Sequence, residues 1–147
     1  MWDKLQDPYH LVALYTALNA LIILVLGILV TRARVVTQVD IGDGGKPEMA
    51  GPLRAHGNNI EWTPMGILLL WMMAPLGGMP WMFNVVGISL TLGRLIHGIA
   101  LSTNTGPSTL RVIGMLLTWI AYIAGIALVI YLGFIYAPDT SAITGDQ

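Results

Sequence analysis

The sequence predicts an all-α integral membrane protein, built as a bundle of four transmembrane helices. Three observations lead to this prediction. The 147 residues are 55% hydrophobic and only 10% charged, with a mean hydropathy of +0.71, far from the balance of a soluble domain. Residues 11–30 and 112–137 carry no charge, and each run can cross a hydrocarbon core of roughly 30 Å as a helix. Two further apolar stretches, interrupted by polar residues, lie between these runs.

The first helix is predicted over about residues 9–32. Its apolar run is longer than the hydrophobic region of a signal peptide, and the preceding MWDKLQDPYH carries little positive charge. We therefore expect a retained helix. The connection that follows, about residues 33–51, contains the segment DIGDGG, which lacks the spacing of a dinucleotide-binding fingerprint or an EF-hand and predicts a turn-rich loop.

The second and third helices are predicted over about residues 52–76 and 80–102. Pro52 suits an early helical position, and the segment GGMP separates the two helices because glycine pairs and proline interrupt helices. The third stretch reaches spanning length only if Arg94 and His97 are included in it. Polar residues are therefore expected inside the bundle.

The fourth helix is predicted over about residues 109–136, with Ser108 or Thr109 as its capping residue. The tail at 138–147 is polar and is expected to be disordered. No internal repeat is visible, so residues 1–147 are predicted to form one four-helix membrane domain.

Lysine and arginine residues predict the orientation in the membrane. The first connection carries Arg32, Arg34 and Lys46, whereas the second connection and the C-terminal tail carry neither residue type. Because cytoplasmic loops are enriched in these residues, the first connection is predicted to be cytoplasmic and both termini non-cytoplasmic.

Polar residues near the cytoplasmic ends of three helices predict a site for an anionic ligand. Arg54 and Glu61 lie two helical turns apart on the second helix, and we expect Glu61 to form an ion pair with Arg94 of the third. Such a pair by itself would only tie helices together. The other residues leave an excess of positive charge, and the forked donors of arginine suit carboxylates. The predicted site consists of Arg54, His56, Asn58, Glu61, Arg94, His97 and Arg111.

Other kinds of site are disfavoured by the composition. His56 and His97 with a single nearby glutamate make a weak metal site, because the neighbouring arginines would repel a cation. The chain has no cysteine, so it has no disulfide framework and any sulfur chemistry must come from a ligand. The net charge of -1 excludes the broad basic surface of a nucleic-acid-binding protein.

The motif RAHGNNIEWTP, residues 54–64, resembles the signature of the MAPEG family, the membrane-associated proteins in eicosanoid and glutathione metabolism. That signature consists of arginine, alanine, histidine or glutamine, a spacer, asparagine, two spacers, glutamate and then proline. GRLIHGIAL, residues 93–101, resembles the third-helix motif of the family, and LRVIG supplies a further matching arginine. The resemblance covers residues 13–134. With GDGG in the first loop it is most similar to a bacterial branch, which implies the bacterial inner membrane.

The resemblance implies a homotrimer that binds glutathione at the cytoplasmic face, between neighbouring subunits. It implies glutathione contacts from Arg54, His56, Asn58, Glu61, Arg94 and His97, with Arg32 as a further candidate. The residue that matches Arg111 is associated with thiol activation, since a guanidinium beside a thiol favours the thiolate and lowers its pKa. The second substrate would be a hydrophobic small molecule from the lipid bilayer.

Two positions depart from the pattern of active family members. Leu101 stands where many members have tyrosine, and Trp62 stands where some do, so hydroxyl donors are missing. Two hypotheses therefore stay open. One is a glutathione transferase or peroxidase acting on hydrophobic electrophiles. The other is a noncatalytic membrane protein that binds glutathione or another anionic or lipid ligand, as a sensor or scaffold.

Overall fold

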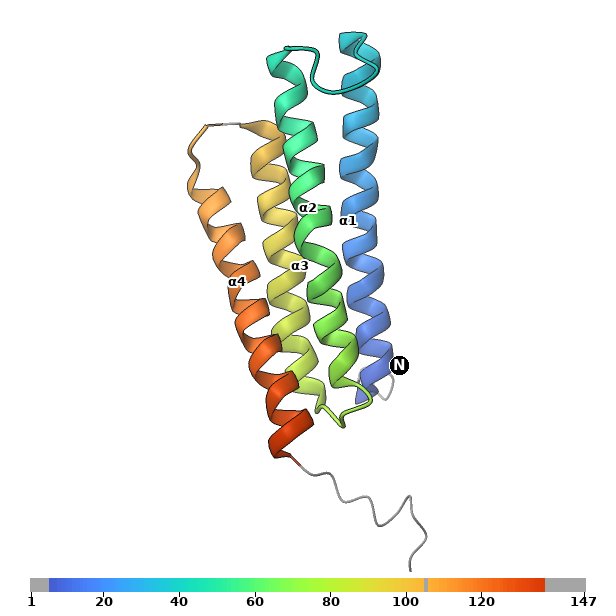
Figure 1. Ribbon diagram of the computed structural model, residues 1–147, viewed down its shortest axis with the longest axis vertical. Helices are drawn as coiled ribbons and strands as arrows, with labels where there is room; N and C mark the ends of the chain where they lie inside the picture. Colours follow the sequence, from blue (N-terminus) through green and yellow to red (C-terminus); the bar gives the residue numbers. More distant parts are fainter. Residues whose placement is uncertain (1–5, 105, 137–147) are drawn as a thin grey trace, which may run out of the picture.

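A computed structural model of the chain describes residues 6–104 and 106–136, which form four long α-helices (Figure 1). They are α1 (Pro8–Thr37), α2 (Pro47–Met73), α3 (Pro80–Thr103) and α4 (Thr109–Ile130), and α4 continues into a π-helical turn, η2 (Tyr131–Ile135). The α1–α2 and α3–α4 connections lie at one end of the bundle and the α2–α3 connection at the other (Figure 1). The predicted all-α bundle is confirmed, and the predicted disordered tail lies outside the described residues.

The first two helices are longer at the α1–α2 connection than the sequence predicted. Helix α1 continues to Thr37, and α2 begins at Pro47 instead of Pro52, which lies inside the helix. Apolar runs end at the first charged residue, but an α-helix can continue beyond the membrane wherever its carbonyl groups find partners. Here the Arg34 guanidinium donates to the carbonyl oxygens of Val39, Asp40 and Gly42, which holds the chain where α1 ends.

The apolar core is unevenly distributed along the bundle. The end that contains the α2–α3 connection, called the apolar end below, is packed around twelve buried residues: Leu11, Val12, Tyr15, Leu70, Met73, Ala74, Met82, Phe83, Val86, Leu90, Ala121 and Leu132. The opposite end, called the polar end, has a small cluster of buried apolar residues formed by Leu26, Ala55 and Leu101. Space at the polar end is therefore shared with polar side chains.

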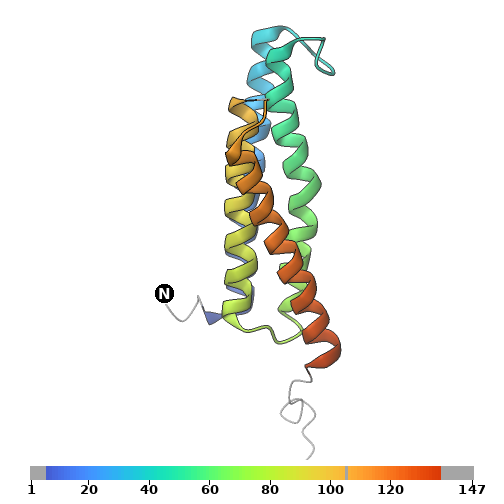
Figure 2. The same cartoon turned by 90° about the vertical axis from the view of Figure 1, so that its left-hand side faces the viewer.

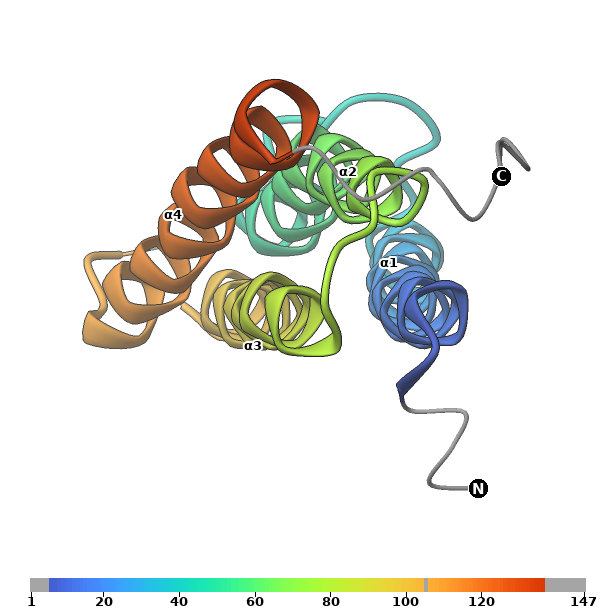
Figure 3. The same cartoon turned by 90° about the horizontal axis from the view of Figure 1, so that it is seen from below.

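Helix α4 crosses the bundle obliquely and packs most closely on α3 at two glycines. A methyl group on Gly93 would lie 2.8 Å from the Thr118 amide nitrogen, and one on Gly114 would lie 2.7 Å from the His97 amide nitrogen. Only glycine at both positions permits this backbone contact. In Figures 2 and 3, α4 runs from beside α2 at the apolar end to the far side of α3 at the polar end.

The chain is an integral membrane protein. In the described part of the chain, α1, α3 and α4 extended by η2 are long and apolar enough to cross a membrane. Their outward side chains include Leu24 and Ile123, which are 60% and 69% exposed, as expected for side chains that face lipid. Helix α2 runs beside them along the bundle and carries the polar RAHGNNIEWTP segment (Figure 1). The cytoplasmic position of the α1–α2 connection stays a prediction.

Candidate anion-binding site

Three helices enclose a cavity of about 250 Å³ at the polar end. Its lining residues are Ala50, Arg54, Asn58, His97, Leu101, Arg111 and Met115. Four of these were predicted as site residues, and they come from α2, α3 and α4. The helical arrangement therefore brings Arg54, Asn58, His97 and Arg111 around one space, although 57 positions separate the first from the last.

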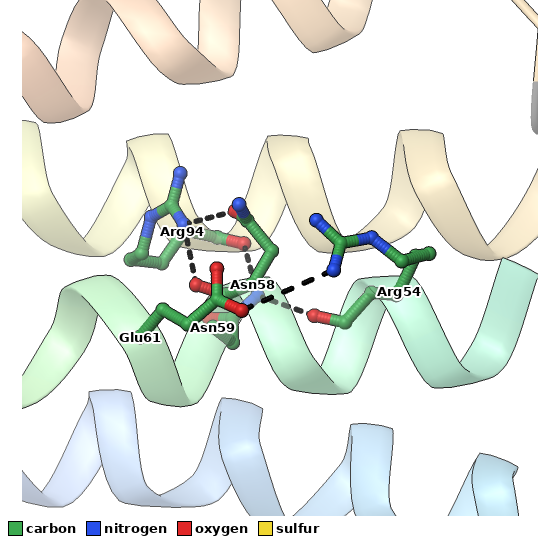
Figure 4. Close-up of polar contacts among 6 residues, drawn as sticks. Arg54, Asn58, Asn59, Glu61 and Arg94 are labelled. Atoms are coloured by element: carbon green, nitrogen blue, oxygen red, sulfur yellow. Dashed lines mark hydrogen bonds and ion pairs between the residues drawn. The ribbon is translucent and has the colours of Figure 1, made fainter. Parts of the chain in front are cut away.

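The expected ion pair between Glu61 and Arg94 is wrong. Glu61 instead lies beside Arg54, with 3.9 Å between Oε1 and Nη1, and both side chains are more than half exposed (Figure 4). At about 100° per residue, positions seven apart return to nearly the same side of a helix. Arg54 and Glu61 therefore lie on the same side of α2, where Glu61 meets Arg54 and not Arg94.

Arg94 is completely buried and is held by neutral partners. Its Nε donates to Thr118 Oγ1 over 3.0 Å. Its Nη1 donates to Asn58 Oδ1 over 2.8 Å (Figure 4). In the part of the chain that the structure describes, no carboxylate forms an ion pair with Arg94. Among the described residues its charge therefore has no counter-charge, which makes the polar end attractive to an anion.

His97, Arg111 and Met115 form the wall that this cavity shares with a second cavity. The second cavity, of about 450 Å³, is lined by these three residues together with Pro107, Ser108 and Val112. His97 is 5% exposed, and its buried Nδ1 has no hydrogen-bond partner among the described residues. Arg111 Nη1 donates to the Gly106 carbonyl oxygen over 2.8 Å, which fastens this arginine to the α3–α4 connection.

Four of the predicted residues do not line the cavity that Arg54 lines: Glu61 and Arg94, described above, and His56 and Arg32. His56 faces α1, where its Nε2 would be 3.5 Å from a methyl group on Gly27. This follows from its place two residues from both Arg54 and Asn58, since two residues turn a helix by about 200°. Arg32 lines a different cavity of about 360 Å³ on the α1 side of α2 and α3, together with Glu48. Neither His56 nor Arg32 contributes to the cavity within one copy of the chain.

Thr118, which is fully buried and contacts Arg94, was not among the residues predicted from the sequence. It lies in an uninterrupted apolar run, where hydropathy hides a single hydroxyl. A signal was present in the spacing, because Thr118 is four residues after Gly114 and seven after Arg111, on the same side of the helix. Small residues at this spacing are typical of close helix contacts in membranes.

Known proteins with similar sequences show which family the chain belongs to. The profile of the MAPEG family matches residues 12–131, which include α2, α3, α4 and all of α1 except its first four residues. The chain belongs to the MAPEG family. It is also 40% identical over 85 residues to the inner membrane protein YecN of Escherichia coli strains K12 and O6:H1. That match covers 58% of this MAPEG chain and 65% of YecN. No solved structure matches the chain.

Proposed function

We propose that this MAPEG protein binds glutathione in the cavity at the polar end. One observation carries the proposal: Arg54, Asn58, His97 and Arg111 surround a single cavity, and the unpaired charge of Arg94 lies behind it. A tripeptide with two carboxylates and one ammonium group matches this charge distribution, since arginine suits carboxylates and Glu61 offers a partner for the ammonium group. The buried Nδ1 of His97 is a further polar atom that a ligand would satisfy.

The proposed reaction is that of a glutathione transferase or peroxidase at the cytoplasmic face of a bacterial inner membrane. The similarity to the inner membrane protein YecN supports placing this protein in the inner membrane. Arg111 lies at the wall between the two cavities, where a guanidinium would favour the glutathione thiolate. The second cavity, with Pro107, Val112 and Met115 in its wall, suits a hydrophobic molecule that enters from the bilayer.

The chemistry requires no group from the protein other than its charges. In a transferase reaction the glutathione sulfur forms a bond with an electrophilic carbon, the leaving group departs with its electron pair, and the thiol proton passes to water. In a peroxidase reaction two glutathione molecules are oxidised to their disulfide while a hydroperoxide is reduced to an alcohol and water. Arg111 would stabilise the thiolate in both cases.

A homotrimer would complete this site. Arg32 lies on the α1 side of α2 and α3, whereas the Arg54 cavity lies on the α4 side, so Arg32 would reach the cavity of a neighbouring copy only. The exposed ion pair of Arg54 and Glu61 also needs cover if it lies at membrane depth. Contact between copies would bring Arg32 to a neighbouring cavity and would cover the Arg54–Glu61 ion pair.

A second candidate function is noncatalytic binding of glutathione or another anionic or lipid ligand. It is favoured by the cavity wall, because the residues that line the Arg54 cavity include no hydroxyl group. Leu101 and Met115 provide apolar walls instead. Such a site would hold an anion without a hydroxyl donor beside the thiol, as expected if the protein is a sensor or scaffold and not an enzyme.

Calorimetric titration of glutathione into the purified protein in lipid nanodiscs tests the proposal, combined with an assay of conjugation to chlorodinitrobenzene. Binding with conjugation supports the transferase, and binding without it supports the noncatalytic function. Absence of binding overturns the transferase and excludes glutathione as the ligand of a noncatalytic site. Arg34→Ala is the matched control, because this arginine contacts loop carbonyl groups outside the cavity and its loss should leave glutathione affinity unchanged.

A further inference from the structure

Arg94 does not line the cavity, but it holds a residue that does. Its Nη1 donates to Asn58 Oδ1 over 2.8 Å, and Asn58 lines the cavity (Figure 4). A guanidinium has donors and no acceptor, so it must face the oxygen of the amide. The Asn58 amide nitrogen is therefore turned away from Arg94, and it donates to no other residue in the described ranges. Asn58 is left to present a hydrogen-bond donor to the cavity.

The direction of the guanidinium is set from the other side by Thr118. Arg94 Nε donates to Thr118 Oγ1 over 3.0 Å. The Thr118 hydroxyl in turn donates its single hydrogen to the Gly114 carbonyl oxygen over 2.8 Å. The oxygen is then free to accept from Arg94, and the whole contact is buried. Helices α2 and α4 thus hold two different nitrogens of one guanidinium.

The backbone contact between α3 and α4 keeps Thr118 in place. A methyl group on Gly93 would lie 2.7 Å from Thr118 Oγ1 and 2.9 Å from the Gly114 carbonyl oxygen, so Arg94 follows a residue that touches α4 directly. Interhelical hydrogen bonds of this kind are retained in membranes because lipid offers no alternative partner.

We propose that Thr118 is a positioning residue for ligand binding: through Arg94 it fixes the Asn58 amide with its nitrogen toward the cavity. Arg54, Asn58 and Arg111 then all offer donors to an anion. Arg94 Nη2 is already buried with no hydrogen-bond partner among the described residues. Without the hydroxyl, Nε would lose its partner too, and the guanidinium would turn to satisfy its nitrogens. Asn58 would then be released to turn its oxygen toward the ligand and repel it. This inference rests on the proposed anion site.

Two substitutions at one position test the role of the hydroxyl. Thr118→Val keeps the shape of the side chain and removes the hydroxyl, and we expect it to weaken glutathione binding about tenfold in calorimetry. Thr118→Ser keeps the hydroxyl and should stay within about twofold of the wild-type affinity. The matched control is Thr91→Val, which removes another interhelical contact, the one from Asn19 Nδ2 over 2.8 Å, and should leave affinity unchanged.

A double-mutant cycle separates positioning from a general structural role. If Thr118 acts through Asn58, Thr118→Val should cause no further loss of affinity in an Asn58→Ala background. Additive losses would overturn the proposal. So would wild-type affinity in Thr118→Val, in which case glutathione binding itself would still stand. If the wild-type protein binds no glutathione, the proposed function and this inference fall together.

Asn58→Asp provides a test that does not depend on the folding of Thr118→Val. The new carboxylate would pair with the buried Arg94, so the melting temperature should be maintained or raised. Its second oxygen would face the cavity as an acceptor, and glutathione affinity should fall about a hundredfold through like-charge repulsion. A stable Asn58→Asp protein with wild-type affinity would overturn the proposed orientation of the amide.

Discussion

The two ends of this bundle are built from the same four helices but differ in what occupies the interior. At the apolar end, side chains from all four helices fill the interior, and Phe83, Leu70 and Met73 have no exposed surface. At the polar end, α4 has crossed away from α2, and the interior contains Asn58, Arg94 and His97 next to cavities. Apolar side chains fill the interior of the apolar end, whereas at the polar end hydrogen bonds of Arg94 connect α2, α3 and α4.

This difference indicates that the residues that stabilise the fold and the residues proposed to bind a ligand lie at opposite ends of the bundle. Lipid is as apolar as a leucine side chain, so helices in a membrane associate through close packing and interhelical hydrogen bonds. Packing is concentrated at the apolar end, which leaves the polar end able to keep an uncompensated arginine that would be costly elsewhere. Changes at the apolar end should therefore affect unfolding, and changes at the polar end should affect binding.

The largest expected effect is loss of packing at the apolar end. Phe83→Ala removes a fully buried ring and should lower the free energy of unfolding by on the order of 4 kcal/mol. Glutathione affinity should stay within about twofold, because the site lies at the other end of the bundle. Denaturation of the detergent-solubilised protein measures the first quantity and calorimetry the second. A large loss of affinity in a variant that stays folded would show that the two ends are coupled.

The next largest effect is expected at Gly114, where the close contact between α3 and α4 lies beside the candidate site. In Gly114→Ala the new methyl group would lie 2.7 Å from a backbone nitrogen of α3, so the helices must separate, at a cost of about 2 kcal/mol. His97 and Arg94 would move relative to α4, and glutathione affinity should fall as well. Gly125→Ala is the matched control on the same helix, because its methyl group would meet side-chain atoms of Leu69 and Val86 at 3.2 Å or more and no backbone atom nearer than that. Equal melting temperatures for the two variants would contradict the prediction.

Two arginines at the polar end should separate binding from thiol activation. Arg54→Ala should weaken glutathione binding about tenfold, as loss of a hydrogen bond to a charged group does. Arg111→Ala should change affinity only a few fold but raise the pKa of the bound thiol, since removal of a nearby positive charge disfavours the thiolate. Ultraviolet absorbance of the thiolate, titrated against pH at saturating glutathione, measures this pKa. An ordinary thiol pKa in the wild-type complex would leave only the noncatalytic hypothesis.

The smallest effect is expected at the beginning of α1, on the apolar end. The backbone N–H of His10, followed by its side chain, lowers the pKa of the Asp7 carboxyl. A lowered pKa means that the ionised form stabilises the folded state, so this contribution is present above pH of about 4 and disappears as the pH falls through the lowered value. Melting temperatures of wild type and Asp7→Asn should therefore converge in acid, because asparagine can cap the helix without titrating. A constant difference across this range would show that ionisation of Asp7 has no effect.

The sequence by itself determined the helical membrane fold, the MAPEG family and the polar composition of the site. A long uncharged run is stable in lipid as a helix, because the helix satisfies its own backbone hydrogen bonds. The RAHGNNIEWTP motif places Arg54 and Asn58 about one helical turn apart. Only the tertiary structure decided the partners of these residues. Glu61 was expected to pair with Arg94 but forms an ion pair with Arg54. Thr118 accepts a hydrogen bond from Arg94, and no local sequence pattern predicted that contact. The physical reason is that periodicity specifies the direction of a side chain on its own helix, whereas the crossing of α4 over α3 at Gly93 and Gly114 depends on the packing of both helices at once.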